Sequence, residues 1–335
     1  MDPAVGERQA RNPLPQLRSG AGTSVLSRHA AAVVRGEADL LAVALPFLEA
    51  GVRAGDVVAL ACPPDVAALL CGELGERADR VRDDPRLSLL GARAPDALAH
   101  ARRSAERARD GGQLRILSLV DFGPTPAGWR EGTRFESATN RVMQGAPIDC
   151  LCLSDRRRLP AAVVETAAAT HPYLVHDGAW APSPAYRDPA DYLAQLPWPR
   201  EPVEDTAPVL ALDDAPSLVA LRHAIGEALA ARVPDRDQRE DLHLAAAEVA
   251  SNAFRHGVRP VSARMWADGD RLVCAITDSG HTFADPLAGF RPAHGTDLGR
   301  GGMGLWLARK LWDSVDLLPG RDGLTVRLST GLHPA

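Results

Sequence analysis

A proline-rich stretch divides the chain of 335 residues into two parts. Residues 196–208, LPWPREPVEDTAP, hold four prolines and three acidic side chains. Each proline removes a backbone donor, and several in succession stiffen the chain. A chain of this length is also expected to form two domains. The sequence therefore predicts a linker over 196–208, with one domain on each side of it.

The part before the linker alternates buried-strand patterns with helical patterns. The strand patterns are VVALACPP (57–64), RLSLLGA (86–92), RILSLVDFG (115–123), IDCLCLS (148–154) and YLVHDGAW (173–180). Helical patterns cover 40–51 (interrupted by Pro46), 65–74, 96–109, 129–143 and 160–171. Because parallel strands need a crossover helix, this order predicts an α/β domain over 25–195, with a mainly parallel sheet. Residues 1–24 show no periodicity and are predicted to be a disordered arm.

The part after the linker has a different order of elements. A strand (209–214) precedes two helices (216–233 and 241–256) and a hairpin of two strands (261–267 and 272–278). A glycine-rich loop over 280–302, a helix over 303–313 and a second hairpin (315–319 and 325–330) follow. This order predicts an α+β two-layer sandwich over 209–335, with helices on one face of an antiparallel sheet.

The helix predicted at 241–256, DLHLAAAEVASNAFRH, carries a row of polar side chains. Glu248, Asn252 and His256 follow one another at a spacing of four, so they stack on one side of the helix. Alanines beside them allow a ligand or another backbone to come close. Taken alone, the row has two interpretations: the solvated face of an amphipathic helix, or one wall of a site.

Two glycine-containing clusters lie downstream of this helix. Asp278-Ser279-Gly280 ends a strand, where it is either a turn or an acceptor beside which a ligand can lie against glycine. The second cluster directly precedes a helix and consists of Gly299, Arg300, Gly301, Gly302, Met303 and Gly304. It is either a flexible connector or a phosphate-binding loop, because glycines and a helix N-terminus supply converging N–H donors.

The order of the three clusters is more specific than any of them. E-x-x-x-N-A-x-x-H-G, then D-x-G, then G-x-G-G-M-G-L resembles the GHKL (Bergerat-fold) ATP-binding superfamily. The compact form, without helical insertions, resembles the RsbW-type anti-sigma factor serine kinases. A sensor histidine kinase is not favoured, since His223 lies inside the predicted first helix of this domain and not on a dimerising hairpin.

The resemblance implies a role for each matching residue. Asn252 would bind the Mg²⁺ that bridges the phosphates of ATP, and Glu248 would act as general base. Asp278 would accept from the adenine amino group, beside Gly280. The lid would consist of Gly299, Arg300, Gly301, Gly302, Met303 and Gly304, with Arg300 either near the γ-phosphate or solvated. His256 would lie near the nucleotide, and Thr325 is either an adenine-contacting residue or an ordinary strand threonine. Members often have D-x-G-x-G, and Thr282 replaces the second glycine here, which reduces backbone freedom at that position. The acid, the amide and the lid are intact, so we expect ATP binding to be retained.

A second resemblance concerns the first domain. His29, the segment 38–60 and the segment THPYLVHDGAWAPSPAY (170–186) resemble the MEDS sensory domain. This implies a RecA-like α/β fold, without a phosphate-binding loop of its own, that senses a small-molecule signal. His29, His171 and Tyr173 are the candidate signal-site residues; the alternatives are a helix-start polar group, a helix stop and strand packing.

Together the two resemblances predict a regulatory serine/threonine kinase. It would use ATP and Mg²⁺ to phosphorylate an anti-anti-sigma (STAS-type) partner, would bind a sigma factor, and would be controlled by the sensory domain. A homodimer is also implied. The alternative is a non-catalytic module that binds ATP or a sigma factor.

Composition excludes other classes. A net charge of −5 argues against direct nucleic-acid binding. No signal-peptide core and no apolar run of about eighteen residues is present, so we expect a cytoplasmic protein. The five cysteines are Cys62, Cys71, Cys150, Cys152 and Cys274. Cys150 and Cys152 face the same side of one predicted strand, as buried reduced thiols or, in the weaker alternative, as part of a metal or redox site.

Overall fold

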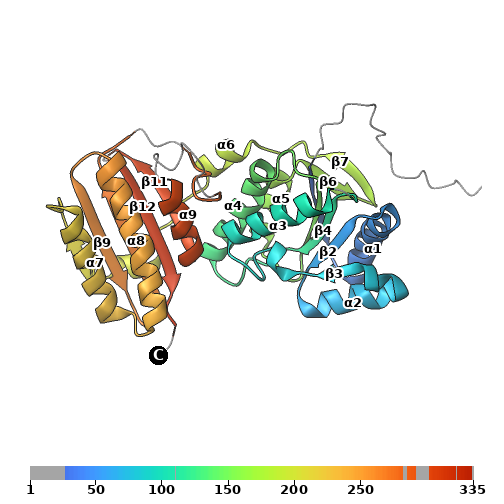
Figure 1. The fold of residues 1–335 in the computed structure, drawn as a ribbon, viewed down its shortest axis with the longest axis horizontal. Coiled ribbons are helices and arrows are strands. Elements are labelled where there is room, and N and C mark those ends of the chain that lie inside the picture. Colours follow the sequence, from blue (N-terminus) through green and yellow to red (C-terminus); the bar gives the residue numbers. More distant parts are fainter. Residues whose placement is uncertain (1–26, 110, 282–284, 292–301, 322, 334–335) are drawn as a thin grey trace, which may run out of the picture.

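The computed structural model describes residues 27–109, 111–281, 285–291, 302–321 and 323–333, and places two lobes side by side (Figure 1). Each lobe is built on its own β-sheet. The first sheet has seven strands and the second has five. The predicted arm over 1–24 lies outside the described residues.

The first sheet is mainly parallel, as predicted. Its strand order is β3-β2-β4-β5-β1-β6-β7, and only β7 runs antiparallel to its neighbour. The strands are β1 (Arg28–Val34), β2 (Val57–Ala61), β3 (Val81–Asp83), β4 (Leu114–Leu119), β5 (Ile148–Asp155), β6 (Tyr173–His176) and β7 (Ala179–Pro182). The central strands β4 and β5 are buried along their whole length, which explains their mainly apolar patterns.

Helices cover both faces of this sheet. On one face lie α1 (Glu37–Ala54) and α2 (Pro64–Leu74), and on the other α3 (Ala94–Ala108), α4 (Pro126–Val142) and α5 (Ala161–Thr170). A short helix, α6 (Pro189–Ala194), and two 3-10 turns, η1 (Gly75–Arg80) and η2 (Pro85–Leu87), complete the connections. Pro46 lies inside α1, which continues through it instead of ending.

Two strand predictions in this lobe were wrong. RLSLLGA is not a strand: it begins in the 3-10 turn η2, where Pro85 has no N–H to give to a sheet, and the edge strand is β3 instead. YLVHDGAW is not one strand but the hairpin of β6 and β7. Its turn residues Asp177 and Gly178 both have positive φ (49° and 76°), which is the type I′ geometry that Asp-Gly favours.

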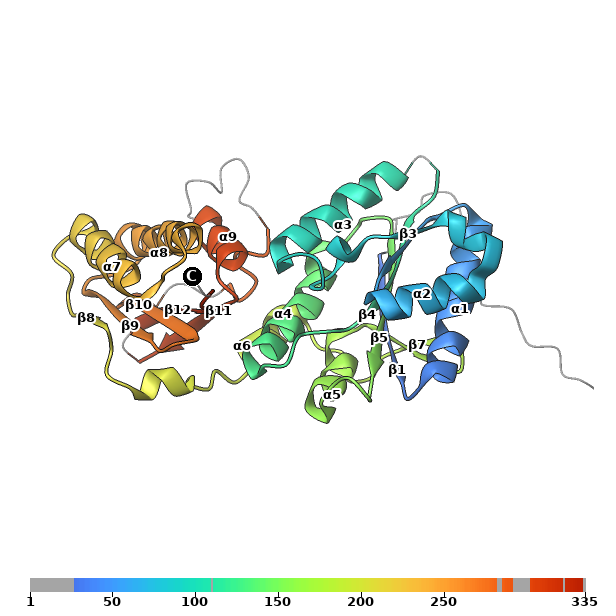
Figure 2. The same ribbon diagram turned by 90° about the horizontal axis from the view of Figure 1, so that it is seen from below.

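The second lobe has the predicted two layers. Its antiparallel sheet has the order β11-β12-β10-β9-β8, and α7, α8 and α9 lie on one face (Figure 2). The elements are β8 (Leu210–Leu212), α7 (Leu218–Arg232), α8 (Arg236–His256), β9 (Val261–Ala267), β10 (Arg271–Asp278), α9 (Gly302–Leu311), β11 (Ser314–Gly320) and β12 (Gly323–Gly331). Ser217 and Asp235 start α7 and α8 by accepting from backbone N–H groups of the first turn.

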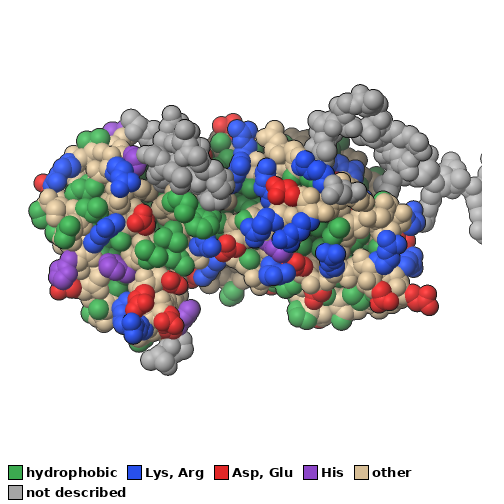
Figure 3. Space-filling view, in the orientation of Figure 1, with side chains coloured by type: hydrophobic (Ala, Val, Ile, Leu, Met, Phe, Trp, Pro, Cys, Tyr) green, Lys and Arg blue, Asp and Glu red, His purple; other side chains and the backbone are tan. Residues whose placement is uncertain are grey.

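Buried charges join the two lobes. Arg134 of α4 donates to Asp316 of β11, which also accepts from Arg327 Nε of β12 at 2.9 Å. Arg327 Nη1 in turn lies 3.0 Å from Glu204, in the 3-10 turn η3 (Pro202–Asp205) inside the predicted linker. Phe290 of the second lobe packs into the apolar core of the first. Side chains of both charges also meet on the surface between the lobes (Figure 3).

Among the described residues, none of the helices has both the length and the apolar character that crossing a membrane requires.

Candidate functional site

Helix α8 presents the predicted polar row on the face toward α7 and α9. Glu248 is half-buried, and one of its carboxylate oxygens lies 3.7 Å from Arg222 Nη2 of α7. Asn252, one turn later, is also half-buried and has a partner. His256 is the last residue of α8 and is exposed. The helix therefore brings an acid and an amide together, with the histidine at its open end.

The lid glycine Gly304 lies against Asn252. A Cβ atom added at Gly304 would lie only 2.6 Å from Asn252 Nδ2 and 3.3 Å from the backbone oxygen of Glu248. Any side chain at this position would require either α9 or the Asn252 amide to move. Gly302 and Met303 open α9, and Met303 is 40% exposed. Gly299, Arg300 and Gly301, like Thr282, lie outside the described residues.

Asp278 ends β10 as a buried carboxylate with one oriented oxygen. Its Oδ1 accepts from the backbone N–H of Val258 at 3.1 Å and from that of Gly280 at 2.7 Å. Within the described part of the chain, these bonds occupy Oδ1 and leave Oδ2 to accept from a ligand. Glycine is required on both sides, because a Cβ at Gly280 would lie 2.7 Å from Oδ1, and one at Gly257 would lie 2.5 Å from it.

Gly257 is a functional position that the sequence prediction did not include among the site residues. It follows His256 at the end of the motif E-x-x-x-N-A-x-x-H-G, and this His-Gly pair could have indicated it. Its role here is to let the end of α8 lie against the carboxylate of Asp278.

Thr325 is not brought to this site. The β10–β12 register pairs Asp278 with Leu324 and Thr277 with Thr325. Directly opposite residues share a face of the sheet, and successive residues alternate. Cys274 and Ile276 belong to the core under the helices, so Asp278 shares that face and Thr325 does not. Thr325 Oγ1 instead forms a 2.8 Å hydrogen bond with Thr277 Oγ1.

Two family models match the chain. Residues 211–330 match the histidine kinase-like ATPase domain, so the second lobe is an ATP-binding domain. Residues 28–172 match the MEDS family, described as the methanogen/methylotroph, DcmR sensory domain. The chain is therefore a MEDS sensory domain fused to a histidine kinase-like ATPase domain. No curated protein matches it.

The sensory domain contains a buried polar cluster in which two predicted residues meet. His29 of β1 and His171, directly after α5, have ring centroids 4.1 Å apart. The Nε2 atoms of His29 and His171 lie 3.1 Å and 3.4 Å from Glu136 Oε2 of α4. Cys152 Sγ lies 3.4 Å from His29 Nε2 and 3.6 Å from Glu136 Oε2. Tyr173 is not part of this cluster, but packs near Trp180 with ring centroids 6.3 Å apart.

The cluster shifts the pKa values of its members. Burial alone would raise the pKa of Glu136, but the adjacent imidazoles of His171 and His29 outweigh burial and lower that pKa. Burial and the neighbouring His29 lower the pKa of His171. The pKa of Cys152 is raised by the adjacent Cys150 thiol and by burial. A carboxylate is thus held ionised inside the domain.

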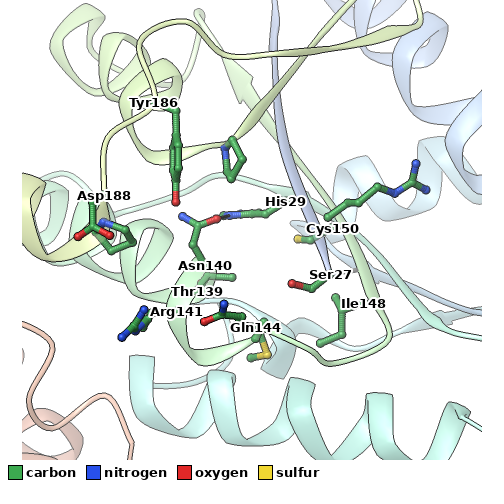
Figure 4. A pocket seen from close by; sticks show the side chains of 14 residues that line it. Ser27, His29, Thr139, Asn140, Arg141, Gln144, Ile148, Cys150, Tyr186 and Asp188 are labelled. Atoms are coloured by element: carbon green, nitrogen blue, oxygen red, sulfur yellow. Dashed lines mark hydrogen bonds between the residues drawn. The ribbon is translucent and has the colours of Figure 1, made fainter. Parts of the chain in front are cut away.

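A cavity of about 280 Å³ adjoins this cluster. Figure 4 shows His29 and Asn140 pointing toward one another at its wall, with Cys150 beside them. The other lining side chains include Ser27, Arg28, Thr139, Arg141, Met143, Gln144, Ile148, Tyr186 and Asp188. Glu136 and Asn140 were missed by the sequence prediction, because polar residues four apart on an amphipathic helix give no signal of their own.

Proposed function

We propose that this protein is an ATP- and Mg²⁺-dependent serine/threonine kinase of the anti-sigma type, regulated by its MEDS domain. The observation that carries the proposal is the packing of Gly304 against Asn252, one turn from Glu248. This packing brings the carboxylate of Glu248, the amide of Asn252 and the glycine-containing N-terminus of α9 close together. Phosphoryl transfer requires such positioned charges more than covalent chemistry.

The residues present suit that chemistry. The amide oxygen of Asn252 is a hard donor of the kind Mg²⁺ accepts, and the ion would neutralise charge on the phosphates. Glu248 would accept the proton of a serine hydroxyl as that oxygen attacks the γ-phosphorus and the bond to ADP breaks. Asp278 Oδ2 would accept from the adenine amino group. Arg222 holds the carboxylate of Glu248 near this face at 3.7 Å.

The partner and its control are part of the same proposal. The phosphorylated protein would be an anti-anti-sigma (STAS-type) protein, and a sigma factor would be the bound target, in a cytoplasmic homodimer. Control would pass through α9, which the sensory domain holds directly: Lys310 Nζ lies 2.9 Å from Asp96 of α3, and Arg309 Nη1 lies 3.4 Å from Glu131 of α4.

Labelled ATP tests the proposal. The full chain is incubated with [γ-³²P]ATP, Mg²⁺ and candidate STAS-type proteins, and label on a partner serine is measured. We expect Glu248→Gln to retain ATP binding and lose transfer, and Asn252→Ala to lose both. Glu227→Gln is the matched control, since among the described residues Glu227 pairs with His223, on the exposed side of α7. Unchanged transfer by Glu248→Gln would contradict the proposed base.

Thr282 supports a second candidate function, a module that binds ATP or a sigma factor without transferring phosphate. Threonine restricts the backbone where related domains often have glycine. In that case ATP-Mg²⁺ raises the melting temperature of the protein, but no partner becomes labelled. Thr282→Gly would then increase ATP affinity.

A further inference from the structure

Four side chains of the sensory domain direct their ligating atoms at one buried point. His29, Glu136, Cys152 and His171 are all buried, and their ligand atoms lie within 4.8 Å of one another. They come from four separate elements or their ends: β1, α4, β5 and the residue after α5. Such convergence of two imidazoles, a carboxylate and a thiol has no role in the ATP site, which lies in the other lobe.

The hydrogen bonds of the two histidines fix where their protons are. His171 Nδ1 lies 2.9 Å from the backbone oxygen of Ala167, which can only accept, so Nδ1 carries the proton. Asn140 Nδ2 donates to the backbone oxygen of Thr170 at 2.7 Å, which leaves Asn140 Oδ1 to accept from His29 Nδ1 at 3.0 Å. In the neutral form, each imidazole therefore turns an Nε2 lone pair toward Glu136.

Three acceptors facing each other in a buried space require a positive charge between them. The Glu136 carboxylate lies 3.1 Å and 3.4 Å from the two Nε2 atoms, and burying these lone pairs without a cation is costly. The cation is either a proton, giving an imidazolium, or a metal ion. A metal-binding histidine usually has this arrangement: its Nδ1–H donates to an oxygen acceptor, and its Nε2 faces the metal.

We propose that His29, Glu136, Cys152 and His171 bind a divalent transition-metal ion, with zinc the best match. In a tetrahedral zinc site with bonds of 2.0–2.3 Å, neighbouring ligand atoms lie about 3.3–3.8 Å apart. Four of the six distances between the ligand atoms measure 3.1, 3.4, 3.4 and 3.6 Å, and the other two are within 4.8 Å. One carboxylate and one thiolate balance the charge of the ion, and the mixture of nitrogen, oxygen and sulfur suits zinc more than Mg²⁺ or Ca²⁺.

Two thiols also lie at the cluster, and a protonated histidine–glutamate pair would not need them. Cys152 Sγ contacts both His29 and Glu136, and Cys150 Sγ lies 3.7 Å from Cys152 Sγ. His29 and Cys150 also line the 280 Å³ cavity, which gives an ion a route to the site. Binding replaces both the proton of the Cys152 thiol and the proton that the histidine–glutamate cluster holds without metal, so two protons are released and no electron is transferred.

Cobalt substitution tests the site on the full chain without nucleotide. The protein is stripped with a chelator and titrated with Co²⁺ and then with Zn²⁺, while visible absorption and proton release into a weak buffer are measured. We expect one ion per chain, a tetrahedral Co²⁺ spectrum with a thiolate charge-transfer band, its loss on adding Zn²⁺, and two protons released per ion.

Variants assign the ligands. Cys152→Ser should lose the charge-transfer band, whereas Cys62→Ser, a buried thiol of the same sheet that lies outside the cluster, should keep it. Asn140→Ala removes the acceptor of His29 Nδ1 and should weaken Co²⁺ binding about 10–100-fold. Circular dichroism checks the fold of each variant, and the wild-type titration does not depend on them.

Two results would overturn the proposal. Wild-type protein that binds no stoichiometric Co²⁺ or Zn²⁺ would identify the cluster as a protonated histidine–glutamate pair. A charge-transfer band that survives in Cys152→Ser would place the ion elsewhere. ATP binding is measured separately, so either result leaves the kinase proposal to its own test.

Discussion

At the scale of single residues, glycines decide how closely the parts of the ATP site approach. Gly304 lets α9 reach Asn252, while Gly257 and Gly280 enclose the carboxylate of Asp278. Among the described glycines, these are the three at which an added methyl group would lie within 3 Å of the side chain of a proposed ATP-binding residue. Substitution by alanine is therefore a sharp probe of the site.

Gly304→Ala should weaken ATP binding. The added Cβ would lie 2.6 Å from Asn252 Nδ2, so α9 or the amide must move. Overpacking of this kind costs about 1–3 kcal/mol. If the cost is paid only in the ATP-bound state, the affinity for ATP decreases roughly 5–150-fold. Isothermal titration calorimetry with ATP-Mg²⁺ measures this change in affinity.

Gly269→Ala is the matched control for this prediction. A Cβ at Gly269 meets nothing within 4 Å, so affinity should stay as in the wild type. Equal affinities for both variants would show that Gly304 does not position the site.

Sequence motifs indicated the residues of the proposed ATP site and not those of the buried cluster, for a physical reason. Glu248 and Asn252 are neighbours on one helix, so their spacing is visible in the chain. Glu136 and His29 are 107 residues apart in sequence, and they meet only because the fold brings α4 to β1. His29 and His171 could be singled out, but the carboxylate that joins them could not.

At the scale of elements, α4 serves both lobes. Its Glu136 and Asn140 face the buried cluster, whereas Glu131 and Arg134 face α9 and β11. Glu131 and Glu136 are about 7.5 Å apart along the helix axis, on nearly opposite sides of it. A change in position of α4 at the cluster would therefore act directly on α9 and β11.

The ion pairs around Asp316 should dominate the stability of that contact. Asp316→Ala leaves Arg134 and Arg327 buried without their shared carboxylate, which should cost about 3–5 kcal/mol. Denaturant unfolding followed by circular dichroism measures the change. Glu240→Ala, which breaks the exposed pair with Arg236 on α8, should leave the midpoint unchanged. Similar midpoints for the two variants would contradict the prediction.

Element prediction failed where local turn chemistry or edge position decided the outcome. Periodicity indicated the long helices and the buried central strands, because packing on a core imposes it. The hairpin of β6 and β7 depends on two positive-φ residues, Asp177 and Gly178, which an apolar pattern does not reveal. The edge strand β3 has three residues, two of them exposed, and so has almost no pattern.

At the scale of the whole molecule, the sequence predicted two unlike lobes but not their junction. The proline-rich segment was expected to separate them, yet Glu201 and Glu204 within it bind Arg271 and Arg327 of the second sheet. Contacts between distant charged side chains leave no signal in one sequence. The lobes are consequently joined more firmly than a linker suggests.

Acid should weaken the molecule through its buried carboxylates. Burial alone would raise the pKa of Asp316, but Arg134 and Arg327 lower it, and the two histidines lower that of Glu136. Groups with a lowered folded-state pKa stabilise the protein above their unfolded pKa of about 4, and this stability is lost as the pH falls further. Melting temperatures between pH 7 and pH 3 should drop mainly below about pH 5.

The Asp316→Ala variant separates this effect from general acid unfolding. Without the carboxylate, its melting temperature should fall less steeply over the same pH range. An unaltered slope would show that Asp316 does not contribute to the acid sensitivity.

The burial of the charges between the lobes also determines how the protein responds to ionic strength. Dissolved ions screen exposed charges over about 8 Å at physiological salt, but they do not enter the space around Arg134, Asp316 and Arg327. The lobes should therefore stay docked from dilute buffer to molar salt, with the same radius of gyration. The sensory domain can then act on the ATPase domain in a way that is independent of the salt content of its surroundings.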